Sequence, residues 1–344
     1  MDLLNVTSKL KELKVPNFRL DQVRRGVFDE AASSYEDIKV LPPELRKNLE
    51  VIAPLMSTKL HRLDISGDKR AYKALLTLAD GKIIETVLLR PTPTRWTTCV
   101  STQVGCAIGC TFCATGLMGL SRNLTPEEIT DQVLFWRQYM RREKFEGRLD
   151  NVVYMGMGEP FATYDNTAES LRRLMDQKQF GIGARHISVS TSGLAPQIER
   201  FGVDFPQVNL AVSLHSADDK LRTKLVPLNK AYPLARLTQA IKKYLSLTKR
   251  KVFIEYVLLR GENDRPEDAT KLIEWVTATG PLSLLHVNLI VFNKTQTPHE
   301  ATLESNAHNF SARVHESGIQ VTVRQNLGRD IQGACGQLIV EEAK

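Results

Sequence analysis

The sequence predicts an α/β fold built around a parallel sheet, and three observations support this prediction. Expected strands and helices alternate from about residue 96 onwards. The expected strands are almost continuously apolar, as strands are when both faces of a sheet are covered. Polar residues recur where these strands end, at the edge where ligands bind in such folds. The six strands expected in series are residues 97–103, 151–157, 186–193, 208–215, 251–259 and 284–292.

Six βα units in series form a parallel sheet, which is either an open wound sheet or a barrel. A final strand is expected at residues 319–325. The helix expected from Pro126 begins with a capping box between Thr125 and Glu128. Other expected helices of this region are residues 167–177, 233–245, 265–276 and 308–317. The three tryptophans are predicted to be core residues rather than platforms for stacked bases.

The first 95 residues differ from this pattern. Residues 4–13 and 42–52 carry a helical period, and Pro42-Pro43 suits a helix start. Three short alternating runs then predict a β-meander, at residues 59–66, 72–79 and 82–89. Pro91 and Pro93 mark an expected linker. The predicted regions are therefore a helical domain (1–60), a β-meander extension with linker (61–95) and the α/β region (96–344).

Composition narrows the class of protein. Hydrophobic residues make up 42% and charged residues 25% of the 344 residues, which is typical of a soluble globular protein. Apolar runs are too short to span a bilayer, and the charged N-terminus does not resemble a secretory signal, so we expect a cytoplasmic protein without membrane contact. The net charge of +7 is compatible with a nucleic-acid partner, although many soluble proteins carry such a charge.

Three of the five cysteines, Cys106, Cys110 and Cys113, form a CxxxCxxC motif after the first expected strand. Five cysteines in a chain of this size and expected compartment do not indicate a disulfide framework. Structural zinc sites use four protein ligands, and Cys99 and Cys335 are not spaced as a second pair. Three thiolates can instead hold an iron–sulfur cluster with one iron left open. We therefore favour a cluster over zinc.

The motif and its surroundings resemble the radical-SAM enzymes, and in more detail the RlmN-type RNA methyltransferases. The resemblance covers about residues 85–338. Matching segments occur in order at residues 103–116, 119–133, 154–160, 189–193, 212–230, 255–269, 287–293 and 334–338. It implies a partial (βα)6 radical-SAM barrel with a small N-terminal helical accessory domain and a β-extension.

The resemblance also implies cofactors and their ligands. Cys106, Cys110 and Cys113 would hold a [4Fe–4S] cluster, whose open iron binds S-adenosylmethionine (SAM). Gly158 and Glu159 match the segment that meets the methionine amine, and a carboxylate complements an ammonium group. The other implied SAM contacts are Phe112, Ser190, Ser213, Leu214, His215 and Asn293.

The implied reaction methylates carbon 2 of an adenine in 23S ribosomal RNA and in transfer RNA. Two SAM molecules are used per turnover. Cys335 takes a methyl group from the first; the radical from the second converts it to a methylene radical that bonds to RNA. Cys99 then attacks the sulfur of Cys335, releasing RNA and leaving a disulfide. Glu85 matches the residue that accepts the proton from the adenine carbon, although its interval to Cys99 is one residue longer than expected.

The resemblance further implies a monomer served by a low-potential electron donor such as flavodoxin or ferredoxin. Two other functions stay open. The sister Cfr-type enzymes methylate carbon 8 of the same ribosomal adenine and confer antibiotic resistance. The segments at 158–160 and 190–193 favour carbon 2, whereas those at 113–116 and 122–132 fit both groups. The second alternative is a non-catalytic RNA-binding protein stabilised by a metal.

Overall fold

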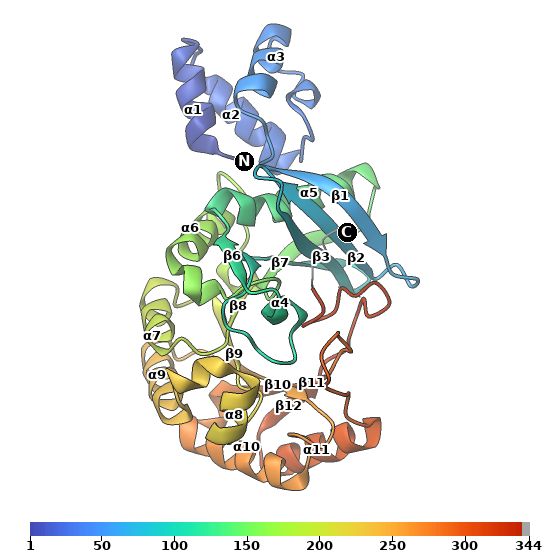
Figure 1. Cartoon of the computed structure of the whole chain (residues 1–344). Helices are drawn as coiled ribbons and strands as arrows, with labels where there is room; N and C mark the ends of the chain where they lie inside the picture. The colour runs from blue at the N-terminus through green and yellow to red at the C-terminus, as the bar shows by residue number, and fades with distance from the viewer. Residues whose placement is uncertain (339–344) are drawn as a thin grey trace.

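The computed structural model describes residues 1–338; residues 339–344, the end of the predicted 96–344 region, lie outside the described residues. Within residues 1–338, ten strands form one mixed sheet, and a separate two-stranded hairpin accompanies it (Figure 1). The strands of the large sheet are, in spatial order, β1 (Thr58–Ile65), β2 (Ala71–Leu78), β3 (Ile83–Thr92), β4 (Arg95–Cys99), β7 (Arg148–Tyr154), β8 (Ile187–Thr191), β9 (Asn209–Ser213), β10 (Val252–Leu258), β11 (Leu285–Val291) and β12 (Gln320–Val323).

The strands from β4 to β12 in this order pair in parallel, which confirms the predicted α/β fold. They correspond to the six expected strands and the expected final strand. The large sheet is open, because β1 and β12 form its two edges within residues 1–338. Figure 1 shows that it curves, with helices along its outer side, which agrees with a partial barrel.

Helices connect the parallel strands. They are α5 (Pro126–Arg142), α6 (Tyr164–Met175), α7 (Ala195–Asp204), α8 (Asp219–Leu225), α9 (Leu234–Thr248), α10 (Pro266–Thr279) and α11 (Glu304–Glu316). The capping box of α5 is confirmed, since the Thr125 hydroxyl accepts from the Glu128 amide at 3.2 Å and the Glu128 carboxylate accepts from the Thr125 amide at 2.9 Å. Short 3₁₀ turns lie at Tyr35–Asp37, Pro160–Thr163, Ala184–His186, Pro227–Lys230 and Leu282–Leu284.

The strand expected at 97–103 is divided in the structure. β4 ends at Cys99, and Gln103–Gly105 (β5) pairs instead with Leu120–Asn123 (β6), after the short helix α4 (Ala114–Leu117). Gly105 explains the end of β5, because its φ of +78° lies in the left-handed region. A Cβ atom there would also lie 1.9 Å from the Gly119 carbonyl oxygen. This hairpin and α4 enclose the segment that carries the three clustered cysteines.

The first three strands form the expected meander and pair antiparallel. The predicted linker at Pro91 and Pro93 was wrong, because β3 reaches Thr92 and pairs antiparallel with β4 across a short turn. Pro93 lies in this turn, which suits its ring-fixed φ angle, whereas Pro91 lies near the end of β3, where the pairing with β4 shifts register. The meander therefore continues directly into the parallel strands, and the division into domains stays a prediction.

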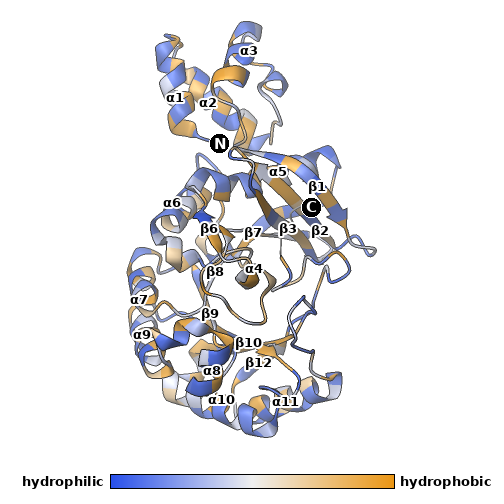
Figure 2. Ribbon diagram, viewed as in Figure 1, coloured by the Kyte–Doolittle hydropathy of each residue, from blue (hydrophilic) through white to orange (hydrophobic). Residues whose placement is uncertain are grey.

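The N-terminal helices are α1 (Leu3–Glu12), α2 (Phe18–Arg24), which continues into a π-helical turn at Arg25–Asp29, and α3 (Pro43–Ile52). They lie beyond α5 at one end of the molecule (Figure 1). Figure 2 shows hydrophobic residues along the strands and hydrophilic residues on outer helix surfaces. Trp96, Trp136 and Trp275 are buried, which confirms their predicted place in the core. In the part of the chain that the structure describes, no helix is long and apolar enough to cross a membrane.

Candidate active site

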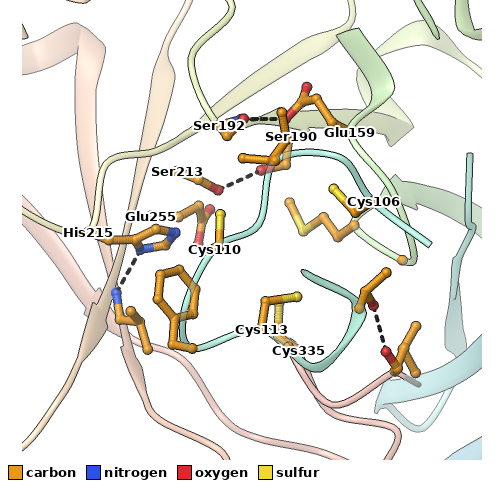
Figure 3. A pocket seen from close by; sticks show the side chains of 18 of the residues that line it. Cys106, Cys110, Cys113, Glu159, Ser190, Ser192, Ser213, His215, Glu255 and Cys335 are labelled. Atoms are coloured by element: carbon orange, nitrogen blue, oxygen red, sulfur yellow. Dashed lines mark hydrogen bonds between the residues drawn. The ribbon is translucent and has the colours of Figure 1, made fainter. Parts of the chain in front are cut away.

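A cavity lies at the carboxyl ends of the parallel strands, and most of the predicted site residues line it (Figure 3). Its empty volume, counting the open mouth, is about 1030 Å³. The predicted residues that line it are Cys106, Cys110, Phe112, Cys113, Gly158, Glu159, Ser190, Ser213, His215, Asn293 and Cys335. Three predicted residues, Glu85, Cys99 and Leu214, lie outside its lining.

Backbone hydrogen bonds fix the cysteine segment at several points. The Cys106 amide donates to the Gly119 carbonyl at 2.9 Å, and the Thr111 amide donates to the Leu225 carbonyl of α8 at 3.0 Å. The Thr111 hydroxyl also contacts His299 Nε2 at 3.0 Å, and His299 Nδ1 contacts Glu262 at 2.5 Å. The cysteine segment is thus held by β6, by α8 and by the loop after β11.

The three thiols fit an iron–sulfur cluster by donor type and by their shared cavity. Burial raises the pKa of Cys106 to about 12 and that of Cys110 well above its ordinary value, whereas a bound metal would favour loss of the thiol protons. Among the described residues, no three His, Cys, Asp or Glu side chains converge closely enough to hold one metal ion. In a four-iron cluster each thiolate binds its own iron, so the thiolates need not converge on one point.

Glu159 is a rigid carboxylate on the cavity wall. One oxygen accepts from the Ser192 amide and hydroxyl, both at 2.7 Å, and the other accepts from the Phe161 amide at 3.0 Å. Burial raises the pKa of Glu159. Gly158 has a φ of +98°, and a Cβ atom there would lie 2.6 Å from the Gln103 side chain. The Gly-Glu pair is thus held by its neighbours, and it faces the cavity.

The ends of β8 and β9 supply the next side of the cavity. The hydroxyls of Ser190 and Ser213 lie 3.3 Å apart. The Phe112 ring meets the edge of the His215 ring at a centroid distance of 4.8 Å. Burial lowers the pKa of His215 to about 3, and its Nδ1 accepts from the Val257 amide, so the neutral ring carries its proton on Nε2. Leu214 lies behind this surface, with its carbonyl accepting from a buried arginine.

Cys335 is exposed to this cavity on the C-terminal segment. Asn293 holds that segment, because its amide donates to the Cys335 carbonyl at 3.0 Å while its oxygen accepts from Arg329 at 2.7 Å. The Ala114 amide also donates to the Gly336 carbonyl at 2.9 Å. The C-terminal segment is therefore joined directly to the helix that follows Cys113.

Cys99 is buried at the end of β4 and lines a second, smaller cavity together with Cys335. All five cysteines of the chain are free thiols, so the disulfide expected between Cys99 and Cys335 is not formed in this structure. Glu85 is buried on β3, where its carboxylate lies 3.1 Å from the Lys73 ammonium, and it lines neither cavity. The structure thus brings the two thiols together but leaves Glu85 apart from them.

Sequence reasoning missed three charged residues at the site. Arg222 of α8 is 1% exposed and donates to the carbonyls of Ser192, Leu214 and Ser213 at 2.7 to 3.3 Å. Glu255 of β10 and Arg324, just after β12, form an ion pair of 3.2 Å on the cavity wall. Glu255 gave a signal, since it is an ionisable residue inside an otherwise apolar strand.

Comparison with known proteins shows the family of this chain. Residues 100–273 match the model of the radical SAM superfamily. The chain belongs to the radical SAM superfamily. This radical SAM chain is 41% identical, over 98% of its length and 91% of the relative, to a probable dual-specificity RNA methyltransferase RlmN of Chloroflexus aurantiacus. It is 37% identical, over 97% of its length and 96% of the relative, to a ribosomal RNA large subunit methyltransferase Cfr of Lachnoclostridium phytofermentans.

A solved structure agrees with these relatives. The crystal structure of a radical SAM methyltransferase from Sphaerobacter thermophilus matches 99% of this chain and 98% of its own, with a TM-score of 0.93 and 41% identity. Within the superfamily, the chain therefore belongs to the radical SAM methyltransferase family that includes RlmN and Cfr. Membership implies SAM and a [4Fe–4S] cluster as its cofactors, and the cavity offers three thiols for that cluster.

Proposed function

We propose that this radical SAM enzyme methylates carbon 2 of an adenine in 23S ribosomal RNA, and in transfer RNA. The observation that carries the proposal is the single cavity shared by the cysteine motif and Cys335. The RlmN relative and the Cfr relative are both named as RNA methyltransferases, which supports RNA as the substrate. Carbon 2 is favoured by the segments at 158–160 and 190–193, which resemble the carbon-2 enzymes.

Different residues of the cavity would bind the cluster and SAM. Cys106, Cys110 and Cys113 would hold the cluster, which with SAM supplies a 5′-deoxyadenosyl radical when bound. Glu159 would accept hydrogen bonds from the SAM amine. Gly158, which has no side chain, would let the backbone approach SAM closely. Phe112, Ser190, Ser213, His215 and Asn293 would form the remaining wall around SAM, with Leu214 supporting it from behind.

Two thiols would act in order. Cys335, exposed to the cavity, would take a methyl group from one SAM and later bond through its carbon to RNA. Cys99, on the other side of Cys335, would release the product by attacking that sulfur. Two SAM molecules would therefore be used per turnover. Glu85 would need to leave its ion pair with Lys73 to accept a proton from the adenine.

Mass spectrometry of ribosomal RNA tests the position of methylation. The gene would be expressed in cells that lack their own carbon-2 methyltransferase, and digested RNA would be compared with authentic 2-methyladenosine and 8-methyladenosine. We expect 2-methyladenosine in 23S RNA and in transfer RNA. An 8-methyladenosine product would instead assign the Cfr-type reaction, and unmodified RNA would favour a non-catalytic RNA-binding protein.

A denaturing gel tests the two-thiol reaction. Cys99→Ala should still methylate Cys335 and cleave SAM, yet stall with RNA covalently attached. Cys335→Ala should attach no RNA, which makes it the matched control. Free methylated RNA released by Cys99→Ala at the normal rate would contradict the mechanism.

The reaction also needs an electron donor and a thiol reductant. A low-potential donor such as flavodoxin or ferredoxin would reduce the cluster, and a thiol reductant would restore Cys99 and Cys335. We propose that the enzyme acts as a monomer in the cytoplasm, where its RNA substrates are made.

A further inference from the structure

Two cavities share a wall at the C-terminal segment. Arg324 and Cys335 line both of them, whereas Cys99 lines only the smaller one. Arg324 therefore lies at the cavity that the two thiols of the proposed reaction share. Neither the sequence motifs nor the comparisons assign this arginine a role.

Arg324 is held in place by contacts from two strands. Its backbone amide donates to the Leu289 carbonyl of β11 at 2.9 Å, as the chain leaves β12. Its Nη1 donates to Glu255 Oε2 of β10 at 3.2 Å. Glu255 is 3% exposed, and its other oxygen accepts from Asn288 of β11 at 2.8 Å. A buried carboxylate with a second partner thus fixes the guanidinium beside the thiols.

The Cys99 thiol would need a nearby positive charge to form a thiolate at neutral pH. Burial raises the pKa of the Cys99 thiol to about 12, which leaves almost none of the nucleophilic thiolate at neutral pH. The charged or titratable side chains that act on it are Cys335, which raises its pKa, and Arg324, which lowers it. A permanently charged guanidinium favours a neighbouring anion, so it would stabilise the thiolate over the thiol.

We propose that Arg324 is a positioning residue that stabilises the Cys99 thiolate during release of methylated RNA, with Glu255 orienting its guanidinium. The inference rests on the proposed function, because it concerns the thiol that resolves the adduct. Cys99 loses a proton to solvent, and its sulfur attacks the Cys335 sulfur. The new S–S bond forms as the Cys335 sulfur–carbon bond breaks. The electron pair of that bond passes to the carbon on adenine, which takes up a proton and becomes the methyl group.

Two variants separate charge from hydrogen bonding. Arg324→Gln keeps a donor for Glu255 but removes the positive charge, whereas Arg324→Lys keeps the charge. Cluster-loaded, Cys335-methylated protein would be mixed with SAM, reductant and RNA, and the adduct followed on denaturing gels. We expect Arg324→Gln to form the adduct and resolve it about tenfold or more slowly at pH 7.5, since one pKa unit changes the thiolate fraction tenfold. Arg324→Lys should stay close to wild type.

A second readout concerns the thiol itself. Alkylation of Cys99 by iodoacetamide, followed by peptide mass spectrometry across pH, should have its midpoint at higher pH in Arg324→Gln than in Arg324→Lys. Arg250→Met is the matched control, since Arg250 donates to Asn209 at the opposite end of the sheet at 2.8 Å. It should change neither readout.

Other outcomes would overturn the inference. Equal adduct lifetimes in Arg324→Gln and Arg324→Lys, or unchanged alkylation midpoints, would show that the charge does not act on Cys99. If Arg324→Gln formed no adduct while Cys335 was still methylated, Arg324 would act by binding the RNA and not by stabilising the Cys99 thiolate. Absence of an adduct in Cys99→Ala, tested in parallel, would reject the two-thiol function rather than the role of Arg324.

Discussion

At the scale of single residues, the site depends on buried thiols whose burial is unfavourable unless they bind a metal. Cys106 and Cys110 are held by backbone contacts on both sides, yet burial raises the pKa of each thiol. Taking three such groups out of water is costly unless a metal replaces their protons. The cysteine segment is therefore built for a bound cluster, which agrees with the superfamily of the chain.

Replacing Cys106, Cys110 or Cys113 by Ala should remove the cluster. An iron with no thiolate ligand is lost readily, so we expect iron and sulfide to fall from about four of each per chain to well below one. Metal analysis and absorbance of anaerobically purified protein measure this. Cys99→Ala is the matched control and should keep full iron. A variant of the motif with full iron and normal SAM cleavage would refute the cluster assignment.

Functional residues could be predicted from the sequence only where they lie in a motif or in a segment that matches the family. The three clustered cysteines follow from their motif, and Cys335 from its matching segment. Arg324 and Glu255 did not, because their pairing joins strands 69 positions apart in sequence. The resemblance alone implied a catalytic role for Glu85, which stays a prediction, and the structure shows its carboxylate paired with Lys73.

At the scale of elements, α8 holds the site together although it has only seven residues. Its Leu225 carbonyl binds the cysteine segment, and its Arg222 binds the ends of β8 and β9. Burial lowers the pKa of Arg222 to about 10, so the guanidinium stays charged at pH 7 among carbonyl acceptors. Such a short helix has too few turns for its periodicity to stand out in the sequence.

Arg222→Met should destabilise the protein and weaken SAM binding together. The change leaves buried carbonyls of Ser192, Leu214 and Ser213 without their donor, which costs about 1–3 kcal/mol of unfolding free energy for each group left unpaired. Denaturant unfolding and calorimetric SAM titration measure the two effects. Arg236→Met, which removes a surface ion pair to Glu199, should change neither appreciably. Unaltered SAM affinity in Arg222→Met would show that the strand ends do not depend on α8.

At the scale of the whole molecule, one sheet joins regions that the sequence separated. The long periodic segments were predicted correctly because their apolar faces repeat over many residues. The junctions were not, because a turn between paired strands and a linker share the same prolines. The N-terminal helices pack on the rest of the chain through apolar contacts, such as that of the Phe28 and Phe180 rings, and through hydrogen bonds between α5 and residues far away in sequence.

Asp131 makes the central contact of this kind. It is fully buried on α5, and its carboxylate accepts from both the amide and the hydroxyl of Ser57, each at 2.7 Å. Ser57 precedes β1, where the N-terminal helices meet the sheet. Hydrogen bonds to a charged acceptor contribute about 1.5–3 kcal/mol, and Asp131→Ala leaves the half-buried Ser57 amide without this partner. Nearby, Gln138 of α5 donates to the Ala32 carbonyl at 2.8 Å, so part of the contact would survive.

Asp131→Ala should therefore loosen the N-terminal helices without disturbing the active site. We expect faster cleavage between residues 53 and 57 by a non-specific protease and a lower unfolding free energy, while iron content stays at the wild-type level. Asp165→Ala is the matched control, because Asp165 is exposed and pairs only with Arg200 at the surface among its described ion pairs. Loss of iron in Asp131→Ala would mean that the contact supports the cluster segment as well, and unchanged proteolysis would mean that other contacts hold the helices in place.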